Sequence, residues 1–90
     1  MYNLNCRYDS RKSFYGKARI MIDDDGIKYL ISYNTRVARI KDGKLGIYGF
    51  YSSTTLRHIK EFAHQELGII GSKKELEVYL IWEEYTIMMD

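Results

Sequence analysis

The feature that most constrains the fold is a pair of alternating segments joined by a tight-turn dipeptide. Residues 36–41 and 45–50 flank Asp42 and Gly43. An Asp-Gly pair supplies the positive backbone φ angles that two-residue hairpin turns require. Alternation with a period of two is typical of strands that have one buried face. The sequence therefore predicts a β-hairpin over residues 36–50.

A second hairpin is predicted just before it. Residues 17–23 and 27–33 alternate in the same way around the acidic, glycine-containing turn at residues 24–26. The return segment is rich in β-branched and aromatic residues, which favour strands. Residues 4–8 alternate too, and they predict an additional edge strand.

After residue 51 the period changes to that of a helix. Residues 52–54 offer N-cap hydroxyl groups, apolar residues follow at spacings of three and four from Leu56 to Leu67, and Gly68 ends the pattern. Arg57 and Glu61 are four residues apart, which predicts a surface ion pair. The side expected to face solvent carries His58, Lys60, His64 and Gln65.

The C-terminal part allows two interpretations. Ser72 and Glu75 form a capping box before an apolar run that reaches Ile87, which predicts a second helix. Residues 75–82 also alternate as a strand does, so helix and strand both stay open for residues 75–89. In either case we expect one α+β domain over residues 1–90, an antiparallel β-meander of four to five strands followed by one or two helices packed on one face.

Charge is unevenly distributed along the 90 residues. Residues 1–60 hold twelve Lys or Arg and five acids, whereas residues 61–90 hold two Lys and seven acids. Such segregation indicates either two parts that attract each other or a basic surface for an anionic partner. Cys6 is the only cysteine, so no intramolecular disulfide can form, and no apolar run reaches the length of a membrane span. We expect a cytoplasmic protein that does not bind a membrane.

The sequence offers few groups for catalysis or metal binding. His58 and His64 are six residues apart, which does not match the spacing of a helical metal-ligand pair. Cys6 fits a buried structural role better than that of a nucleophile. We therefore predict no metal, no cofactor and no enzymatic activity, with catalysis through these three side chains as the alternative.

A basic and aromatic stretch is the main candidate for binding. Residues 7–19 combine five Lys or Arg with three aromatic side chains and two serines, a mixture that suits phosphates and stacked bases. It also suits a loop whose aromatic rings cover the sheet while its charges face water. Tyr29 and Tyr33 share a strand face and are expected in the core, whereas other tyrosines are free to contact a partner. The predicted partner-binding residues are Arg7, Tyr8, Arg11, Lys12, Tyr15, Lys17, Arg19, Arg36, Arg39, Tyr48 and Tyr51.

Three stretches, residues 8–18, 32–38 and 48–62, carry a resemblance to a known family. The chain resembles a family of short proteins of unknown function from Gram-positive bacteria, their phages and plasmids. The resemblance implies a mobile-element origin and brings no catalytic residues. By analogy of origin, it points to an inhibitor of a host defence protein such as a CRISPR effector, acting in the manner of an anti-CRISPR protein by occupying a nucleic-acid or partner site. A small DNA- or RNA-binding accessory protein is the alternative, and exposed sheet edges leave a homodimer open.

Overall fold

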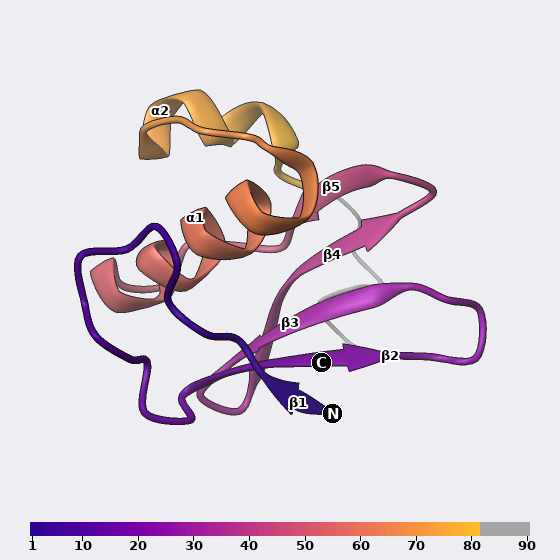
Figure 1. Ribbon diagram of the computed structural model, residues 1–90. Helices are drawn as coiled ribbons and strands as arrows, with labels where there is room; N and C mark the ends of the chain where they lie inside the picture. The colour runs from indigo at the N-terminus through magenta and orange to yellow at the C-terminus, as the bar shows by residue number, and fades with distance from the viewer. Residues whose placement is uncertain (82–90) are drawn as a thin grey trace.

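Five strands, paired in the order in which they follow one another along the chain, form a single antiparallel sheet (Figure 1). The computed structural model describes residues 1–81. The strands are β1 (Tyr2–Asn3), β2 (Ala18–Ile22), β3 (Lys28–Ser32), β4 (Thr35–Lys41) and β5 (Lys44–Ile47). The predicted meander and its α+β class are confirmed.

The edge strand lies earlier than predicted. β1 ends at Asn3, and residues 4–8 do not continue it. Leu4 still donates its N–H to Ala18 O at 2.9 Å, and its side chain enters the core. The chain then leaves the sheet, and the backbone N–H groups of Tyr8 and Asp9 bond to a helix side chain described below. The predicted strand over residues 4–8 is therefore wrong in position.

One face of the sheet forms the core with the helices. Ile20 pairs with Leu30, Leu30 with Ala38 and Ala38 with Ile47, and these four side chains have no exposed surface. Each pairing partner points to the same face, since side chains directly opposite in a sheet share a side. Burying each Leu or Ile contributes about 1.5–3 kcal/mol relative to leaving it exposed.

Helix α1 (Ser53–Leu67) covers this face, as Figure 1 shows. Ser52 caps its start by accepting the Thr55 N–H at 3.1 Å, and Gly68 ends it in the left-handed conformation with φ of 68°. Both predicted caps are confirmed. The buried stripe of the helix includes Phe62, which has no exposed surface.

His58 does not lie on the solvent side of α1, as the helical pattern predicted, but in the core with 1% of its surface exposed. Its Nδ1 lies 2.8 Å from Ser32 Oγ, and its ring packs edge-on against Phe14 at 4.5 Å. Phe14 belongs to the segment of residues 4–17, which we call the N-terminal loop and which folds over this side of the helix. The loop widens the buried face of α1 beyond the apolar stripe.

Burial gives the protein a pH-dependent stability. Loss of solvent around the ring lowers the pKa of His58 below its ordinary value of 6.5. Below that pH the unfolded chain takes up a proton that the folded protein does not, so stability falls as pH falls, by at most about 1.4 kcal/mol per pH unit. Urea unfolding of the wild type at about pH 7.5 and pH 5.5 should show this loss, whereas His58→Asn should flatten it. His64→Gln, on the same helix, is the control, and an equal pH slope in His58→Asn and wild type would contradict the assignment.

The C-terminal part of the described chain is a short helix followed by a bridge to the sheet. The capping box at Ser72 is present and begins α2 (Lys73–Leu76), after which the 3₁₀ helix η1 (Glu77–Tyr79) ends the helical segment. Leu80 then bridges Ile47 in parallel, and Ile81 donates its N–H to Ile47 O at 2.8 Å. The predicted helix therefore does not include residues 80 and 81. Residues 82–90, and the rest of that question, lie outside the described residues.

Gly46 shows why the chain can return to β5 at this point. A Cβ atom on Gly46 would overlap the Ile81 side chain, so a larger residue at position 46 would require that side chain to move away. Within residues 1–81, neither α1 nor α2 is long and apolar enough to cross a bilayer.

Candidate functional site

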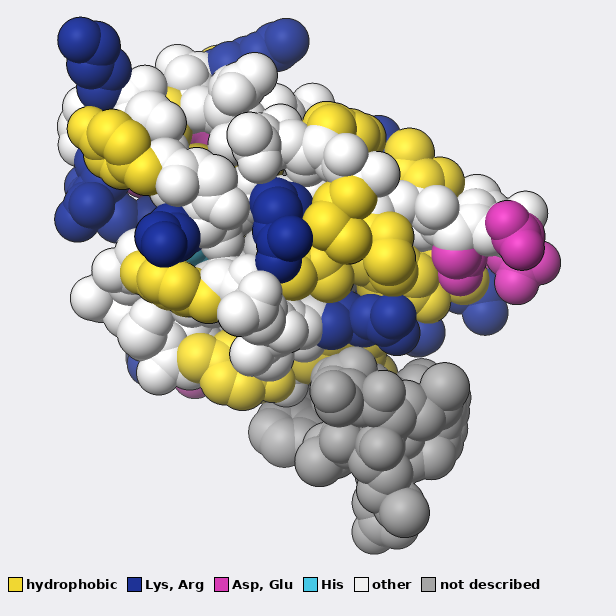
Figure 2. All heavy atoms as spheres, turned by 90° about the horizontal axis from the view of Figure 1, so that it is seen from below, with side chains coloured by type: hydrophobic (Ala, Val, Ile, Leu, Met, Phe, Trp, Pro, Cys, Tyr) yellow, Lys and Arg dark blue, Asp and Glu magenta, His cyan; other side chains and the backbone are white. Residues whose placement is uncertain are grey.

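The face of the sheet that points away from α1 is strongly basic. We define the basic sheet face as the side chains of Lys17, Arg19, Arg36, Arg39, Lys41 and Lys44. Their shared side follows from the register: Ile31 pairs with both Arg19 and Arg36, and Tyr29 pairs with Arg39. β2, β3, β4 and β5 contain no Asp or Glu. Figure 2 shows the result from below, with Lys and Arg side chains set among hydrophobic ones and carboxylates gathered at one end.

Two of these arginines are held in place by the sheet itself. The Arg36 guanidinium carbon lies 4.1 Å from the centre of the Tyr29 ring, within the range of a cation–π interaction. Arg19 Nη2 donates to Tyr33 O at 2.8 Å and to Asn34 Oδ1 at 3.1 Å. Both side chains therefore present their remaining donors from fixed positions, which lowers the entropy cost of binding an anion.

A buried carboxylate anchors the N-terminal loop to α1. Glu61 has 2% of its surface exposed, and it accepts the Tyr8 N–H at 3.0 Å, the Asp9 N–H at 2.7 Å and Gln65 Nε2 at 2.6 Å. Desolvation raises the pKa of Glu61, but these hydrogen bonds outweigh it and the net pKa is lowered. The predicted Arg57–Glu61 surface pair is wrong, because Glu61 bonds to the loop and Arg57 Nε pairs with Asp9 at 3.4 Å.

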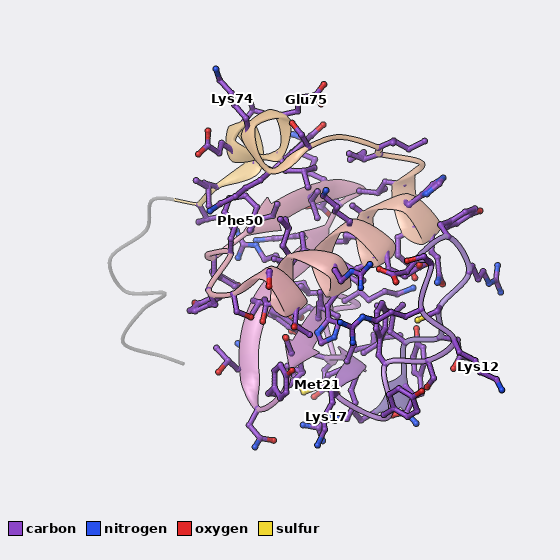
Figure 3. All side chains as sticks on the ribbon, turned by 90° about the vertical axis from the view of Figure 1, so that its left-hand side faces the viewer. Lys12, Lys17, Met21, Phe50, Lys74 and Glu75 are labelled. Carbon is purple, nitrogen blue, oxygen red and sulfur yellow. The ribbon has the colours of Figure 1, made fainter. Side chains whose placement is uncertain are left out.

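This anchoring leaves the basic residues of the loop in solvent. Arg7, Arg11 and Lys12 are exposed. Figure 3 shows Lys12 projecting from the loop, with Lys17 and Met21 on the opposite side of the molecule from Lys74 in α2. The loop thus adds positive charge beside the sheet.

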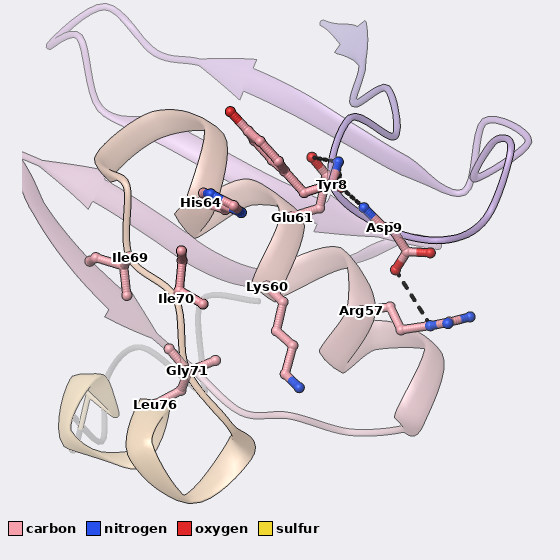
Figure 4. Close-up of a pocket in the computed structure, with 10 residues that line it drawn as sticks. All are labelled: Tyr8, Asp9, Arg57, Lys60, Glu61, His64, Ile69, Ile70, Gly71 and Leu76. Carbon is pink, nitrogen blue, oxygen red and sulfur yellow. Dashed lines mark hydrogen bonds and ion pairs between the residues drawn. The ribbon is translucent and has the colours of Figure 1, made fainter.

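A shallow groove of about 340 Å³ runs along α1 between the N-terminal loop and residues 69–71. Figure 4 shows Tyr8 and Asp9 on one side, the 69–71 segment on the other and Lys60 between them. The Tyr8 and His64 rings stack at 3.5 Å, which fixes the wall formed by the loop. The carboxylate of Glu61 at its base is already saturated by backbone donors, so it cannot serve as a general base without releasing the loop.

The structure divides the predicted partner-binding residues into three groups. Arg7, Tyr8, Arg11, Lys12 and Tyr15 lie on the N-terminal loop, and Lys17, Arg19, Arg36 and Arg39 lie on the basic sheet face. Tyr48 and Tyr51 lie on the connection between β5 and α1, with Tyr51 exposed and Tyr48 half-buried. The sheet therefore brings together basic residues from both hairpins, while the predicted tyrosines stand around it.

Tyr33 was missed by the sequence pattern. Tyr29 is buried as expected, but Tyr33 is 46% exposed because it begins the two-residue loop between β3 and β4 and has left the strand. Its φ of 60° reverses the chain there. The signal that pointed to this was Asn34, a residue favoured in turns, directly before the next alternating segment.

The groups considered for catalysis are not arranged for it in residues 1–81. Burial, with the nearby Asp9 and Glu61 carboxylates, raises the pKa of the Cys6 thiol and keeps it protonated, which makes it a poor nucleophile. His58 is occupied in the core. The described chain holds no group of three or more His, Cys, Asp or Glu side chains placed to bind a metal ion.

Comparison with known proteins identifies the family of the chain. The model of a family of unknown function (DUF8033) matches residues 2–78. This range includes the stretches that carried the resemblance and ends within η1. No curated protein and no solved structure matched the chain.

Proposed function

This chain belongs to the family of unknown function DUF8033, and we propose that it is a binding protein that contacts nucleic acid with its basic sheet face. The observation that carries the proposal is the gathering of six Lys and Arg side chains from β2, β4, β5 and their flanks on one side of a sheet whose strands carry no carboxylate. We place its action in the cytoplasm.

The spacing of these charges suits an extended polyanion. Arg19 and Arg36 lie on strands separated by β3, which puts their backbones about 10 Å apart at the usual strand spacing. Lys41 and Lys44 extend the charge toward the Asp42-Gly43 turn. Several phosphates of one strand can thus be contacted together, and each contact releases condensed counterions.

The alternative of a host-defence inhibitor from a mobile element stays a prediction. An inhibitor of this kind would occupy the nucleic-acid site of its target protein, which is itself basic. The basic sheet face and that site would then repel each other, which opposes docking. The basic sheet face therefore favours the nucleic-acid binder, or an inhibitor that docks on an acidic surface of its target. A homodimer through the β1 edge is compatible with either role.

The test is direct binding of the full chain to labelled oligonucleotides over a salt series. Six phosphate contacts to a single strand predict a slope of about −4 in log K against log salt, so affinity should fall more than about 100-fold between 50 and 200 mM salt. Fluorescence anisotropy with single-stranded DNA and RNA measures this. Absence of binding to both at about 50 mM salt, where the electrostatic term is strongest, overturns the proposal.

A further inference from the structure

The groove along α1, between the N-terminal loop and residues 69–71, suits another protein surface better than a small molecule. Its volume of about 340 Å³ lies at the small end of ligand pockets, which span about 300–1,000 Å³. It is also shallow, whereas a small-molecule site encloses most of its ligand. Figure 4 shows Ile69, Ile70 and Leu76 along one side, which makes that side apolar. An apolar side chain that projects from a protein can therefore bind there.

One charged group in the groove has no counter-charge. Arg57 pairs with Asp9, and the Glu61 carboxylate accepts hydrogen bonds from the N-terminal loop. Lys60 is exposed, lies between the two sides of the groove and forms no ion pair with any residue in the range 1–81. A carboxylate from another molecule can thus bind Lys60 without displacing a partner. The groove is therefore complementary to an acidic residue that lies next to an apolar one.

This pair of residues is present on the same chain, beside the groove. Glu77 and Val78 lie on η1 and directly follow Leu76, which lines the groove. Glu77 is exposed and forms no ion pair within the described part of the chain. Val78 is 79% exposed, and Ile70, on the side of the groove, is 76% exposed. Within residues 1–81 no other large hydrophobic side chain is more exposed than these two, and such neighbouring apolar exposure marks contact surfaces.

A second copy of the chain can satisfy both features at once. Val78 lies within one helical turn of Leu76, so the projecting side chain and the groove are neighbours on one surface. A twofold axis that passes between them brings the Val78 side chain of each copy to the groove of the other. Such a contact is isologous, the kind on which most homodimers are built.

We propose that the protein forms a twofold homodimer through this groove, in which Glu77 of one copy pairs with Lys60 of the other and Val78 packs against Ile70. The groove lies on the helical side of the molecule, and Figure 3 shows that α2 is on the opposite side from Lys17. Both basic sheet faces therefore point outward from the dimer. The inference does not depend on the proposed function, because association is measured without nucleic acid.

Sedimentation velocity of the full chain, over a concentration series that reaches about 1 mM, tests the contact by charge reversal. Lys60→Glu and Glu77→Lys should each weaken dimerisation at least about 10-fold, because like charges then meet at both symmetric positions. The double variant should restore the dimer, since each pair is rebuilt with its signs exchanged. Asp24→Lys is the matched control, because it makes the same charge change at an exposed position in the turn between β2 and β3.

The apolar half of the contact is tested with Val78→Asn. This variant should weaken dimerisation at least about 10-fold, because each dimer loses two buried valine side chains. The thermal midpoint of the dilute monomer should stay that of the wild type, since substitution of an exposed residue changes folding stability little.

Three results would overturn the inference. The first is a wild-type chain that stays monomeric over the whole series. The second is a dimer that neither charge reversal weakens, which would place the contact at another surface such as the β1 edge. The third is a double variant that folds but does not associate, which would show that Glu77 and Lys60 do not pair. If a reversal variant does not fold, Lys60→Gln and Glu77→Gln repeat the comparison, because they remove each charge without reversing it.

Discussion

The Glu61→Ala variant is expected to lose about 3 kcal/mol of unfolding free energy and to release the N-terminal loop from α1. Two backbone N–H groups, those of Tyr8 and Asp9, lose their acceptor at once. Each donor left unsatisfied away from water costs about 1–3 kcal/mol. Urea unfolding measures the stability, and trypsin cleavage at Arg11 and Lys12 reports release of the loop.

Glu66→Ala is the matched control on the same helix. Its carboxylate pairs with Lys28 Nζ at 2.8 Å, but both side chains are 26% exposed, and partly exposed ion pairs contribute at most about 1 kcal/mol. Glu61→Gln keeps one acceptor oxygen and should lie between the two, which preserves the test if the alanine variant does not fold. An equal loss in Glu61→Ala and Glu66→Ala would show that Glu61 does not anchor the loop.

Acidification should reproduce the effect of the substitution in the wild type. The pKa of Glu61 is lowered in the folded protein from its ordinary value of 4.5. The stabilisation is therefore present above pH 4.5 and is lost as pH falls through the lower folded pKa. This pH range lies below the range in which protonation of His58 lowers stability, so the two contributions should appear as separate losses of unfolding free energy in a pH series.

Local signals in the sequence were sufficient for the two hairpins of the sheet and for the ends of α1, but not for the edge strand. Asp42-Gly43 and the alternation around it gave the β4–β5 hairpin, and Ser52 and Gly68 gave the limits of α1. Each of these signals acts within a few residues: a turn needs particular φ angles, and a cap satisfies the nearest free backbone groups. No knowledge of distant contacts is needed to read them.

The errors concern residues whose environment is made by distant parts of the chain. His58 and Glu61 lie on the polar side of the helical pattern, yet the N-terminal loop covers both. The helical segment ends at residue 79, where Leu80 bridges Ile47 and Ile81 donates its N–H to Ile47 O, more than 30 positions away in the sequence. Periodicity within one segment cannot indicate which other segment will pack against it.

The candidate site was predicted only in part, because it too depends on contacts between segments that are distant in the sequence. Alternation placed Arg36 and Arg39 in a strand, but their alignment with Arg19 depends on the register between β2, β3 and β4. That register includes a bulge at Leu30 and Ile31, which the sequence pattern does not mark. The turn conformation of Tyr33 also depends on how β3 meets β4, and within the sequence only the neighbouring Asn34 indicates it.

The combined variant Lys17→Gln, Arg36→Gln and Lys41→Gln should weaken nucleic-acid binding by about 100-fold at low salt. Lys17 and Lys41 are exposed and Arg36 is half-buried against Tyr29, so glutamine keeps a polar side chain with part of the aliphatic stem at each position while removing the charge. Three fewer phosphate contacts lower the single-strand salt slope by about 2. The affinities of variant and wild type should therefore converge as salt rises toward about 1 M, where the counterion term vanishes.

Lys60→Gln, Lys73→Gln and Lys74→Gln together form the matched control, because they remove the same charge from the helical side of the protein. If net charge alone governs binding, both triple variants lose affinity equally. If the basic sheet face is the contact surface, only the first loses the steep salt dependence, since counterions are released only where phosphates touch the protein. Equal slopes of log K against log salt in the two variants would place the contact elsewhere. The experiment therefore tests where the charge lies on the fold, not how much charge the protein carries.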